Sequence, residues 1–396
     1  MKIRKIIPFT CFFFLISLSA ISQIIPGADR LSEYIDYLKD KRIGMVVNPT
    51  SRIGDKPSVD SLLSLGVNII KVFGPEHGFR GDVGAGVKIK DDVDPITGVN
   101  VVSLYGKTNK PTKKMLEDVD LIIFDIQDIG VRYFTYIATM HRVMEACAEN
   151  DKELLILDRP NPNGYFVDGP ILDMAYKSGI GMHPVPITHG MTIGEYAQMI
   201  NGEGWLANGI TCKIKVIQVA NYKHDMEYVP PVNMSPNINT YQAVLLYPST
   251  CLFEGTVLSE GRGTKFPFTL IGAPEFKGIY DFSFIPISIE TMSATPIHLG
   301  KECYGLDLRS VDLREIRDSR KINLSWLIET YKKFPDKEIF FDNKQSKEIV
   351  VFDKLAGGPL LKEQIISGMS EEDIRKSWKS GLDKYNKMRK KYLIYE

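Results

Sequence analysis

The chain has 396 residues, of which 44 % are hydrophobic and 25 % are charged. This is an ordinary globular balance, and the length is sufficient for two or three domains with a sizeable buried core. The 49 basic and 49 acidic residues cancel to a formal net charge of zero. Such a balance argues against nucleic acid or an anionic membrane surface as a partner.

The N-terminus has the layout of a secretory signal peptide. Three basic residues within positions 2–5 precede an apolar run over 6–21, and a small-x-small cleavage site lies at 20–22. A membrane anchor is the alternative, but the run is short for a spanning helix and contains Pro8. We therefore predict that residues 1–22 are removed, that no membrane span remains, and that the protein is periplasmic or secreted.

The first half of the mature chain alternates short apolar runs with helical patterns. Strands are predicted near residues 44–47, 68–73, 99–104, 121–124, 154–157 and 213–219. Helices are predicted between them, near residues 59–65, 112–119, 134–149 and 193–201. This alternation predicts an α/β fold with a Rossmann-like, mostly parallel sheet and helices on both of its faces.

The pattern becomes irregular after Tyr241, with Gly- and Pro-rich loops, a short strand near 281–289 and charged helical segments at 371–377 and 382–392. We predict a Rossmann-like catalytic domain over residues 23–244. A smaller α+β domain over residues 245–396 is expected to complete a cleft.

Several familiar ligand-binding patterns are missing from the sequence. No phosphate-cradling GxxxxGK[ST], HExxH or GxSxG motif is present, and the six His residues are spread along the chain. We therefore expect no metal and no cofactor. The four cysteines that follow the signal peptide are also scattered. They fit small buried apolar residues, with one disulfide as the alternative.

Polar residues follow four of the predicted strands directly. The four segments are Asn48-Pro49-Thr50, Gly74-Pro75-Glu76-His77, Asp125-Ile126-Gln127-Asp128 and Asp158-Arg159-Pro160-Asn161. In an open parallel sheet, ligands bind beyond the carboxyl ends of the strands. A scaffold needs only ordinary turn residues there, so these side chains predict a catalytic or binding cleft.

Glu76 is the strongest catalytic candidate. It lies in a Gly-rich turn and is flanked by Phe73 and Phe79. A carboxyl group in a partly apolar loop can have a raised pKa and act as a general acid. The alternative is a turn carboxylate that pairs with Arg80.

Asp125 and Glu254 are the candidates for a second catalytic carboxylate. Asp125 shares a strand face with Gln127, and Asp128 could instead cap the following helix. Glu254 lies near Glu260 and Arg262 in Gly-rich loops that suit a clamp at the domain junction.

The remaining candidates are assigned to substrate binding. Arginine is a natural partner for a ligand carboxylate, although Asp158 and Arg159 could pair with each other inside their loop. Thr192 and Glu195 predict a capping box for the helix at 193–201, which leaves His189 free to face the cleft. The full set of predicted binding residues is Asn48, His77, Arg80, Gln127, Asp128, Arg132, Tyr133, Asp158, Arg159, Asn161, His189, Glu260 and Arg262.

Five long segments resemble one known family. They are FGPEHGFRGDVGAGVKIKDDVDPITGVNVVSLYGKT, FDIQDIGVRYFTYIATM, LDRPNPNGYFVDGPIL, PITHGMTIGEYAQMIN and LFEGTVLSEGRGTKFPFTLIGAP. These segments resemble the exo-β-N-acetylmuramidases of glycoside hydrolase family 171, and the resemblance extends over almost the whole mature chain. It implies a Rossmann-like domain and a smaller C-terminal domain with the active site in the cleft between them.

The resemblance also implies an activity and a substrate. The activity is release of N-acetylmuramic acid from the non-reducing end of peptidoglycan-derived saccharides, with Glu76 at the position of the family's proposed catalytic glutamate. The alternative is a non-catalytic protein that binds cell-wall sugars in the same cleft. Three arginines, Arg132, Arg159 and Arg262, are candidates for binding the lactyl carboxylate of muramic acid. The oligomeric state is left open.

Overall fold

The structure is a computed structural model that describes residues 23–76, 78–81, 92–106, 108–342 and 351–396. The predicted signal peptide and His77 lie outside these residues. Within them, no helix is both long enough and apolar enough to cross a membrane.

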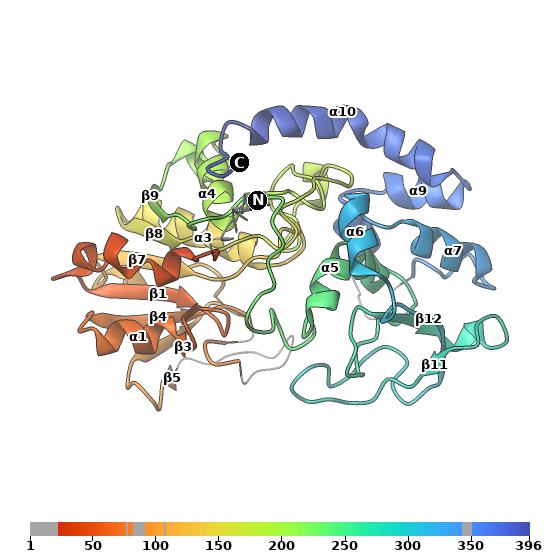
Figure 1. The fold of residues 1–396 in the computed structure, drawn as a ribbon, viewed down its shortest axis with the longest axis horizontal. Coiled ribbons are helices and arrows are strands. Elements are labelled where there is room, and N and C mark those ends of the chain that lie inside the picture. Colours follow the sequence, from red (N-terminus) through yellow and green to blue (C-terminus); the bar gives the residue numbers. More distant parts are fainter. Residues whose placement is uncertain (1–22, 77, 82–91, 107, 343–350) are drawn as a thin grey trace, which may run out of the picture.

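A seven-stranded sheet forms the centre of the first domain (Figure 1). Its strands, in spatial order, are β5 (Asp92–Val93), β6 (Asn100–Ser103), β4 (Ile69–Gly74), β1 (Ile43–Val47), β7 (Leu121–Asp125), β8 (Glu153–Leu157) and β9 (Lys213–Ile217). All neighbouring strands run parallel except β5, which pairs antiparallel with β6. The predicted mostly parallel sheet is confirmed, with β5 as an additional short edge strand.

Alternate residues of the central strands pack on opposite faces of this sheet, as the period of two in a strand requires. Val46, Phe124 and Ile156 face the cluster that contains α3 (Tyr136–Glu149) and α4 (Ile193–Gly202). Their sequence neighbours face a second cluster that contains α1 (Ser58–Ser64). Continuous apolar strands are therefore needed, because both faces are covered by helices.

The first domain also contains short elements between these strands and helices. They are η1 (Gly27–Asp29), η2 (Leu31–Glu33), η3 (Asp36–Leu38), β2 (Arg52–Ile53), β3 (Lys56–Pro57), α2 (Lys113–Leu116), η4 (Met174–Tyr176) and η5 (Ala207–Gly209). The capping box predicted for α4 is present. Thr192 Oγ1 accepts from the Glu195 backbone N–H at 3.3 Å, and Glu195 Oε2 accepts from the Thr192 N–H at 2.9 Å.

The smaller C-terminal domain combines helices with a three-stranded antiparallel sheet in the order β10-β12-β11. Its elements are α5 (Tyr241–Thr250), η6 (Cys251–Gly255), β10 (Leu270–Ala273), η7 (Pro274–Phe276), β11 (Ser283–Phe284), β12 (Cys303–Asp307), α6 (Leu313–Ser319), α7 (Ser325–Lys333), α8 (Val351–Ala356), α9 (Leu360–Ile366) and α10 (Glu371–Arg389). The strand predicted near 281–289 is reduced to the two residues of β11.

The predicted charged helical tail is present as one continuous helix, α10, which ends at Arg389. Gly381 lies inside this helix, and a Cβ atom there would come within 2.9 Å of the Ile171 side chain. The glycine therefore permits close packing and does not end the helix. Figure 1 shows α10 running above both domains. Its contacts with the first domain include Arg375 with Asp168 at 2.7 Å.

Candidate active site

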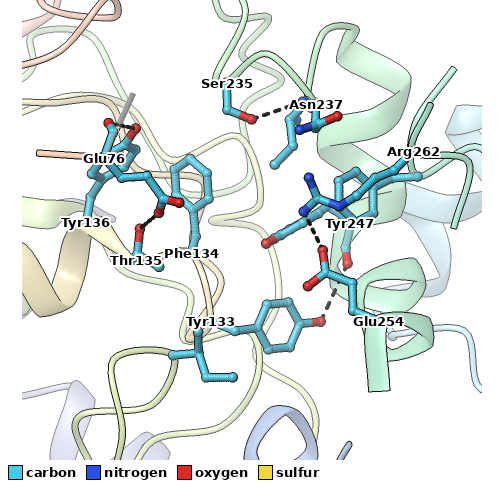
Figure 2. A pocket seen from close by; sticks show the side chains of 13 residues that line it. Glu76, Tyr133, Phe134, Thr135, Tyr136, Ser235, Asn237, Tyr247, Glu254 and Arg262 are labelled. Carbon is cyan, nitrogen blue, oxygen red and sulfur yellow. Dashed lines mark hydrogen bonds and ion pairs between the residues drawn. The ribbon is translucent and has the colours of Figure 1, made fainter. Parts of the chain in front are cut away.

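A cavity of about 190 Å³ lies where loops of the two domains meet (Figure 2). Its lining is formed by Glu76, Tyr133, Phe134, Thr135, Tyr136, Ile180, Ser235, Asn237, Ile238, Tyr247, Glu254, Arg262 and Phe268. Glu76 follows β4, and residues 133–136 follow β7. The cavity thus lies beyond the carboxyl ends of the parallel strands.

The turn that carries Glu76 is closed by a glycine. Gly78 has a φ of 74°, in the left-handed region, and its N–H donates to the Pro75 carbonyl at 2.9 Å. The hydroxyl of Thr135 donates to Glu76 Oε2 at 3.3 Å. Burial, the negative charge of Glu76 and a hydrogen bond to its carboxylate together raise the pKa of Tyr105 to about 12.

The Glu76 carboxylate also lies at the start of a helix. Thr135 is the N-cap residue of α3, and Tyr136 is the first residue of that helix. The N-terminus of a helix carries partial positive charge, which stabilises a nearby anion. The hydroxyl of Thr135 and the start of α3 therefore both stabilise negative charge on Glu76.

Opposite Glu76, the second domain contributes a cluster of three charged side chains. Arg262 donates from Nη2 to Glu254 Oε1 at 2.6 Å and contacts Glu260 Oε1 through Nε at 2.8 Å. Burial and the negative charge of Glu254 raise the pKa of Glu260, and the positive charge of Arg262 lowers it. The resulting pKa is about 7. Burial acts to lower the pKa of Arg262, but the carboxylates of Glu254 and Glu260 have the larger combined effect and raise it overall.

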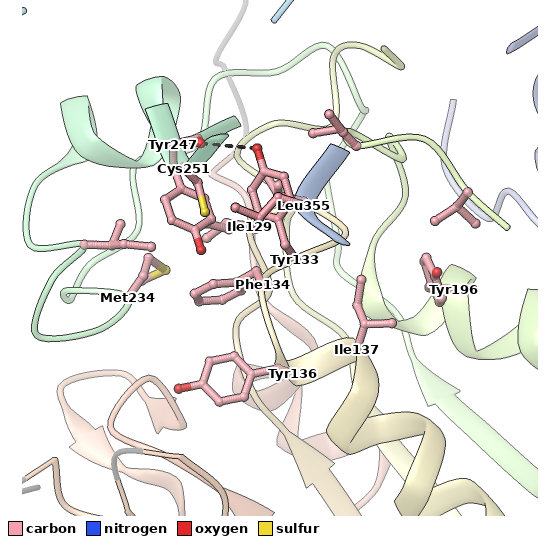
Figure 3. Close-up of a cluster of buried hydrophobic side chains, with 14 of the residues drawn as sticks. Ile129, Tyr133, Phe134, Tyr136, Ile137, Tyr196, Met234, Tyr247, Cys251 and Leu355 are labelled. Atoms are coloured by element: carbon pink, nitrogen blue, oxygen red, sulfur yellow. Dashed lines mark hydrogen bonds between the residues drawn. The ribbon is translucent and has the colours of Figure 1, made fainter. Parts of the chain in front are cut away.

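The cavity has aromatic walls. The rings of Tyr133 and Tyr247 lie edge to face with centroids 5.5 Å apart, and Tyr247 meets Phe268 at 4.8 Å. Figure 3 shows the rings of Tyr133 and Tyr247 together with those of Phe134 and Tyr136. The Tyr133 hydroxyl donates to the Pro248 carbonyl, which fixes that ring. Apolar walls with a few convergent polar groups are typical of sites for small ligands.

A second cavity, of about 250 Å³, lies on the other side of the charged cluster. It is lined by Glu254, Thr256, Leu258, Glu260, Arg262, Ser293, Thr295, Pro296, Ile297 and Val351. Glu254 and Arg262 line both cavities, so this ion pair forms part of the wall between them.

Arg80 does not pair with Glu76, which was the alternative to a catalytic role for that glutamate. Its guanidinium instead contacts Asp60 at 2.9 Å and Asp94 at 2.7 Å. A hydrogen bond from Arg80 lowers the pKa of Asp94 to about 2. Glu76 is therefore left facing the cavity.

Asp125 and Asp158 are enclosed beneath the strand ends. Asp125 is fully buried and pairs with Arg159 at 2.7 Å, and burial raises its pKa. Asp158 accepts from the Thr192 hydroxyl at 2.7 Å and from the Tyr395 hydroxyl at 2.6 Å. The Arg159 side chain therefore pairs with Asp125 at the end of the neighbouring strand β7. The carboxylate of Asp158, in the same loop as Arg159, accepts from the hydroxyls of other residues.

Arg132 is also enclosed. Its guanidinium donates to the carbonyls of Pro170 at 2.9 Å, Val185 at 2.7 Å and Leu355 at 2.8 Å. Burial lowers its pKa to about 10. Because Leu355 lies in α8, this arginine connects the two domains.

The remaining candidates form a buried polar layer under the cavity. Gln127 donates to the Pro160 carbonyl at 2.6 Å, and Asp128 accepts from the Gly130 N–H at 2.6 Å, in a local turn that precedes α3. His189 is fully buried and lies 3.5 Å from Asp128. Two asparagines complete this layer: Asn48 accepts from the Thr50 N–H, and Asn161 donates to the Met191 carbonyl. None of these side chains is in the cavity lining.

Several lining residues were missed by the sequence analysis. The run Phe134-Thr135-Tyr136 lies within the quoted segment FDIQDIGVRYFTYIATM, and its aromatic content was an available signal. Ser235 and Asn237 had no such signal, because only the packing of their loop brings them to the cavity. The four described cysteines are free and buried, and no cluster of metal-binding side chains is found among the described residues.

The fold and the cavity define a two-domain α/β protein with an acidic, aromatic-walled site at the domain junction. The chain belongs to the NamZ family of exo-β-N-acetylmuramidases. The family's N-terminal model, "Exo-beta-N-acetylmuramidase NamZ, N-terminal", matches residues 43–242, and its C-terminal model matches residues 245–395.

Relatives of the chain agree with this membership. It is 41 % identical over 390 residues to "Peptidoglycan beta-N-acetylmuramidase NamZ" of Bacillus subtilis (strain 168), covering 94 % of this chain and 92 % of the relative. A DUF1343 family protein of Bacteroides fragilis NCTC 9343 has a solved structure with 42 % identity and a TM-score of 0.86, covering 95 % and 99 % of the two chains. A second such structure has 31 % identity and a TM-score of 0.78, covering 94 % and 99 %.

Proposed function

We propose that this protein is a glycoside hydrolase that releases N-acetylmuramic acid from the non-reducing end of peptidoglycan fragments. The observation that carries the proposal is the position of Glu76, whose carboxyl faces an aromatic-walled cavity in a member of the NamZ family. The activity in the printed name of the Bacillus subtilis relative supports the same substrate class.

Glu76 is the general acid in this proposal. Its proton passes to the glycosidic oxygen as the bond from that oxygen to C1 breaks. The negative charge that develops on Glu76 is stabilised by the Thr135 hydroxyl and by the start of α3.

A glycosidase also needs a second group across the sugar. Asp125 and Glu254 were the expected carboxylates. Asp125 is outside the cavity lining and is paired with Arg159, while Glu254 lines the cavity but is held by Arg262. A carboxylate that is engaged by an arginine is a weak nucleophile or base.

The proposal therefore assigns this second role to the acetamido group of the sugar itself. Its oxygen forms a bond to C1 as the leaving oxygen departs with the proton from Glu76. Water then attacks C1 and breaks the bond to the acetamido oxygen, and Glu76 takes a proton from that water. The products are one monosaccharide and the shortened glycan, and Glu76 is again protonated.

Arg262 is the arginine that this proposal assigns to the lactyl carboxylate of muramic acid. Among the described residues that line the cavity, it is the one cation, and its side chain is 26 % exposed. Arg132 and Arg159 are buried and donate to backbone carbonyls or to Asp125. A guanidinium carries five N–H donors, so contacts with two glutamates leave donors for a ligand carboxylate.

We also infer that the protein is exported and acts in the periplasm or outside the cell. The support is the sequence pattern of residues 1–22 and the location of peptidoglycan outside the cytoplasmic membrane.

A chromogenic aryl β-glycoside of N-acetylmuramic acid tests the activity directly. The purified protein should release the aryl alcohol, and a peptidoglycan disaccharide with muramic acid at its non-reducing end should yield free N-acetylmuramic acid by mass spectrometry. Saturable binding of either compound without turnover would instead support the alternative, a protein that binds cell-wall sugars without cleaving them.

A further inference from the structure

The wall that separates the two cavities has a specific composition. Glu254 and Arg262 line both the active-site cavity and the cavity of about 250 Å³ behind it. They are joined by a hydrogen bond of 2.6 Å, and Glu254 is 28 % exposed. A charged, hydrogen-bonded pair therefore stands where the active-site cavity would otherwise extend into the second domain.

The chemistry of muramic acid fixes which part of the sugar meets this wall. In a pyranose ring, C4 lies opposite C1, and C3, which carries the lactyl group, is next to C4. If Glu76 is at C1 and Arg262 holds the lactyl carboxylate, the 4-hydroxyl points toward Glu254. Figure 2 shows Glu76 on one side of the cavity and the Glu254–Arg262 pair on the other, as this orientation requires.

We infer that Glu254 binds the free 4-hydroxyl of the terminal sugar and, with Arg262, closes the cavity to chains that are extended at that oxygen. The inference rests on the proposed function, and it gives that function its exo specificity. A glycan extended at O4 would place its next sugar at the ion pair. Only the terminal unit of a chain fits in front of it.

Glu254 has the hydrogen-bonding capacity for this role. A carboxylate has two oxygens with about four lone-pair sites. Arg262 donates to one of these oxygens, Oε1. Acceptance of a sugar O–H by a carboxylate is a charge-assisted hydrogen bond, which is stronger than a bond between neutral groups. Glu254 is therefore a specificity-determining residue in this inference.

A pair of substrates and two variants test the inference. The substrates are the aryl β-glycosides of N-acetylmuramic acid and of its 4-deoxy analogue, and the variants are Glu254→Ala and the isosteric Glu254→Gln. For the wild type, kcat/KM should be about 10- to 100-fold lower on the 4-deoxy glycoside, the usual effect of a lost hydrogen bond to a charged group. For Glu254→Ala, the kcat/KM values on the two substrates should agree within about twofold, the scatter expected of uncoupled groups. Glu254→Gln should give an intermediate ratio.

A third substrate, the 4-O-methyl glycoside, tests the closed wall. The wild type should not hydrolyse it at a measurable rate, whereas Glu254→Ala, which removes the side chain at the wall, should gain turnover. The matched control is Glu371→Gln, because Glu371 also pairs with an arginine, Arg375 at 2.9 Å, and is 34 % exposed. This control should keep the substrate ratios of the wild type.

Two results would overturn the inference. One is a wild type that hydrolyses the 4-hydroxy and 4-deoxy glycosides equally well, a comparison that needs no variant to fold. The other is a Glu254→Ala variant that loses the same factor on both, because Glu254 would then act on the reaction itself. A folded wild type without turnover of any aryl glycoside would instead refute the proposed function and this inference with it.

Discussion

Arg262 and Glu254 are joined by a hydrogen bond of 2.6 Å, and both side chains face two cavities at once. In the proposed function, different ends of the sugar meet different domains. The first domain would supply the acid near the bond to be broken, and the second would supply the groups that recognise the terminal sugar.

Replacing Arg262 with lysine should impair recognition of muramic acid more than it impairs catalysis. Lysine keeps the charge but cannot bind a carboxylate through two parallel N–H groups. We expect kcat/KM for the N-acetylmuramic acid glycoside to fall about 10- to 100-fold. The kcat/KM for the N-acetylglucosamine glycoside, which lacks the lactyl group, should change little. Arg309→Lys is the control, since Arg309 pairs with Asp307 at 2.7 Å outside the cavity. Equal losses on both glycosides would count against a lactyl contact.

Glu76→Gln should keep the fold and lose at least about 10² in kcat, the lower end of general acid–base catalysis. The loss should shrink as the aryl leaving group becomes more acidic, because such a group needs less protonation. The measurement is a series of nitrophenyl and halophenyl glycosides, with circular dichroism to confirm folding. Near-normal turnover of a poor leaving group by the folded variant would refute the assignment.

The Glu260 carboxyl should make both stability and substrate binding depend on pH. Folding raises its pKa from 4.5 to about 7, mainly through burial. The folded state therefore favours the protonated form, so its contribution to stability is fully present below about pH 4.5 and is lost as the pH rises through about 7. Ionised Glu260 also competes for Arg262, so KM should rise over the upper part of this range.

Glu260→Gln is the variant that checks this dependence. Urea unfolding between about pH 4.5 and pH 8 should show a flatter profile than that of the wild type. KM for the muramic acid glycoside should also lose its rise near neutral pH. An unchanged slope in both measurements would show that another group titrates in this range.

Arg132→Met should destabilise the protein without changing substrate recognition. The substitution leaves the carbonyls of Pro170, Val185 and Leu355 without their donor. We expect a loss of at least about 3 kcal/mol in the free energy of unfolding, because each unsatisfied buried group costs about 1–3 kcal/mol. Below the unfolding temperature, KM should match that of the wild type. A stable variant with a raised KM would instead show that Arg132 takes part in substrate binding.

The sequence predicted the sheet well because its central strands, such as Ile43–Val47, are buried on both faces. Runs such as residues 121–124 are apolar throughout, and this pattern is visible without a structure. The antiparallel edge strand, Asp92–Val93, was missed because its two exposed residues carry no periodic signal. The residues between the two predicted helical segments were left unassigned, because Gly381 serves tertiary packing, which a local pattern does not reveal.

The candidate site was predicted less completely than the fold. The strand-end rule pointed to the edge where the cavity lies, and Glu76, Tyr133, Glu254 and Arg262 line that cavity. The same rule does not distinguish side chains that face a ligand from those that support the loops. Asp158 and Arg159 resemble site residues in the sequence, but in the structure they bind hydroxyls, backbone groups and Asp125. Their placement depends on long-range contacts, such as that between Asp158 and Tyr395.

The path of α10 has a practical consequence for dissecting the protein. This helix belongs to the C-terminal family segment, yet Tyr385 donates to the His189 carbonyl at 2.8 Å and Arg389 donates to the Gly190 carbonyl at 3.0 Å. A fragment that stops after the Rossmann-like sheet would leave these carbonyls and the apolar surface under the helix open to water. Chimeras that exchange the second domain between relatives should therefore keep the native α10 together with the first domain. Such chimeras need a second junction before Glu371, in addition to the junction near residue 245.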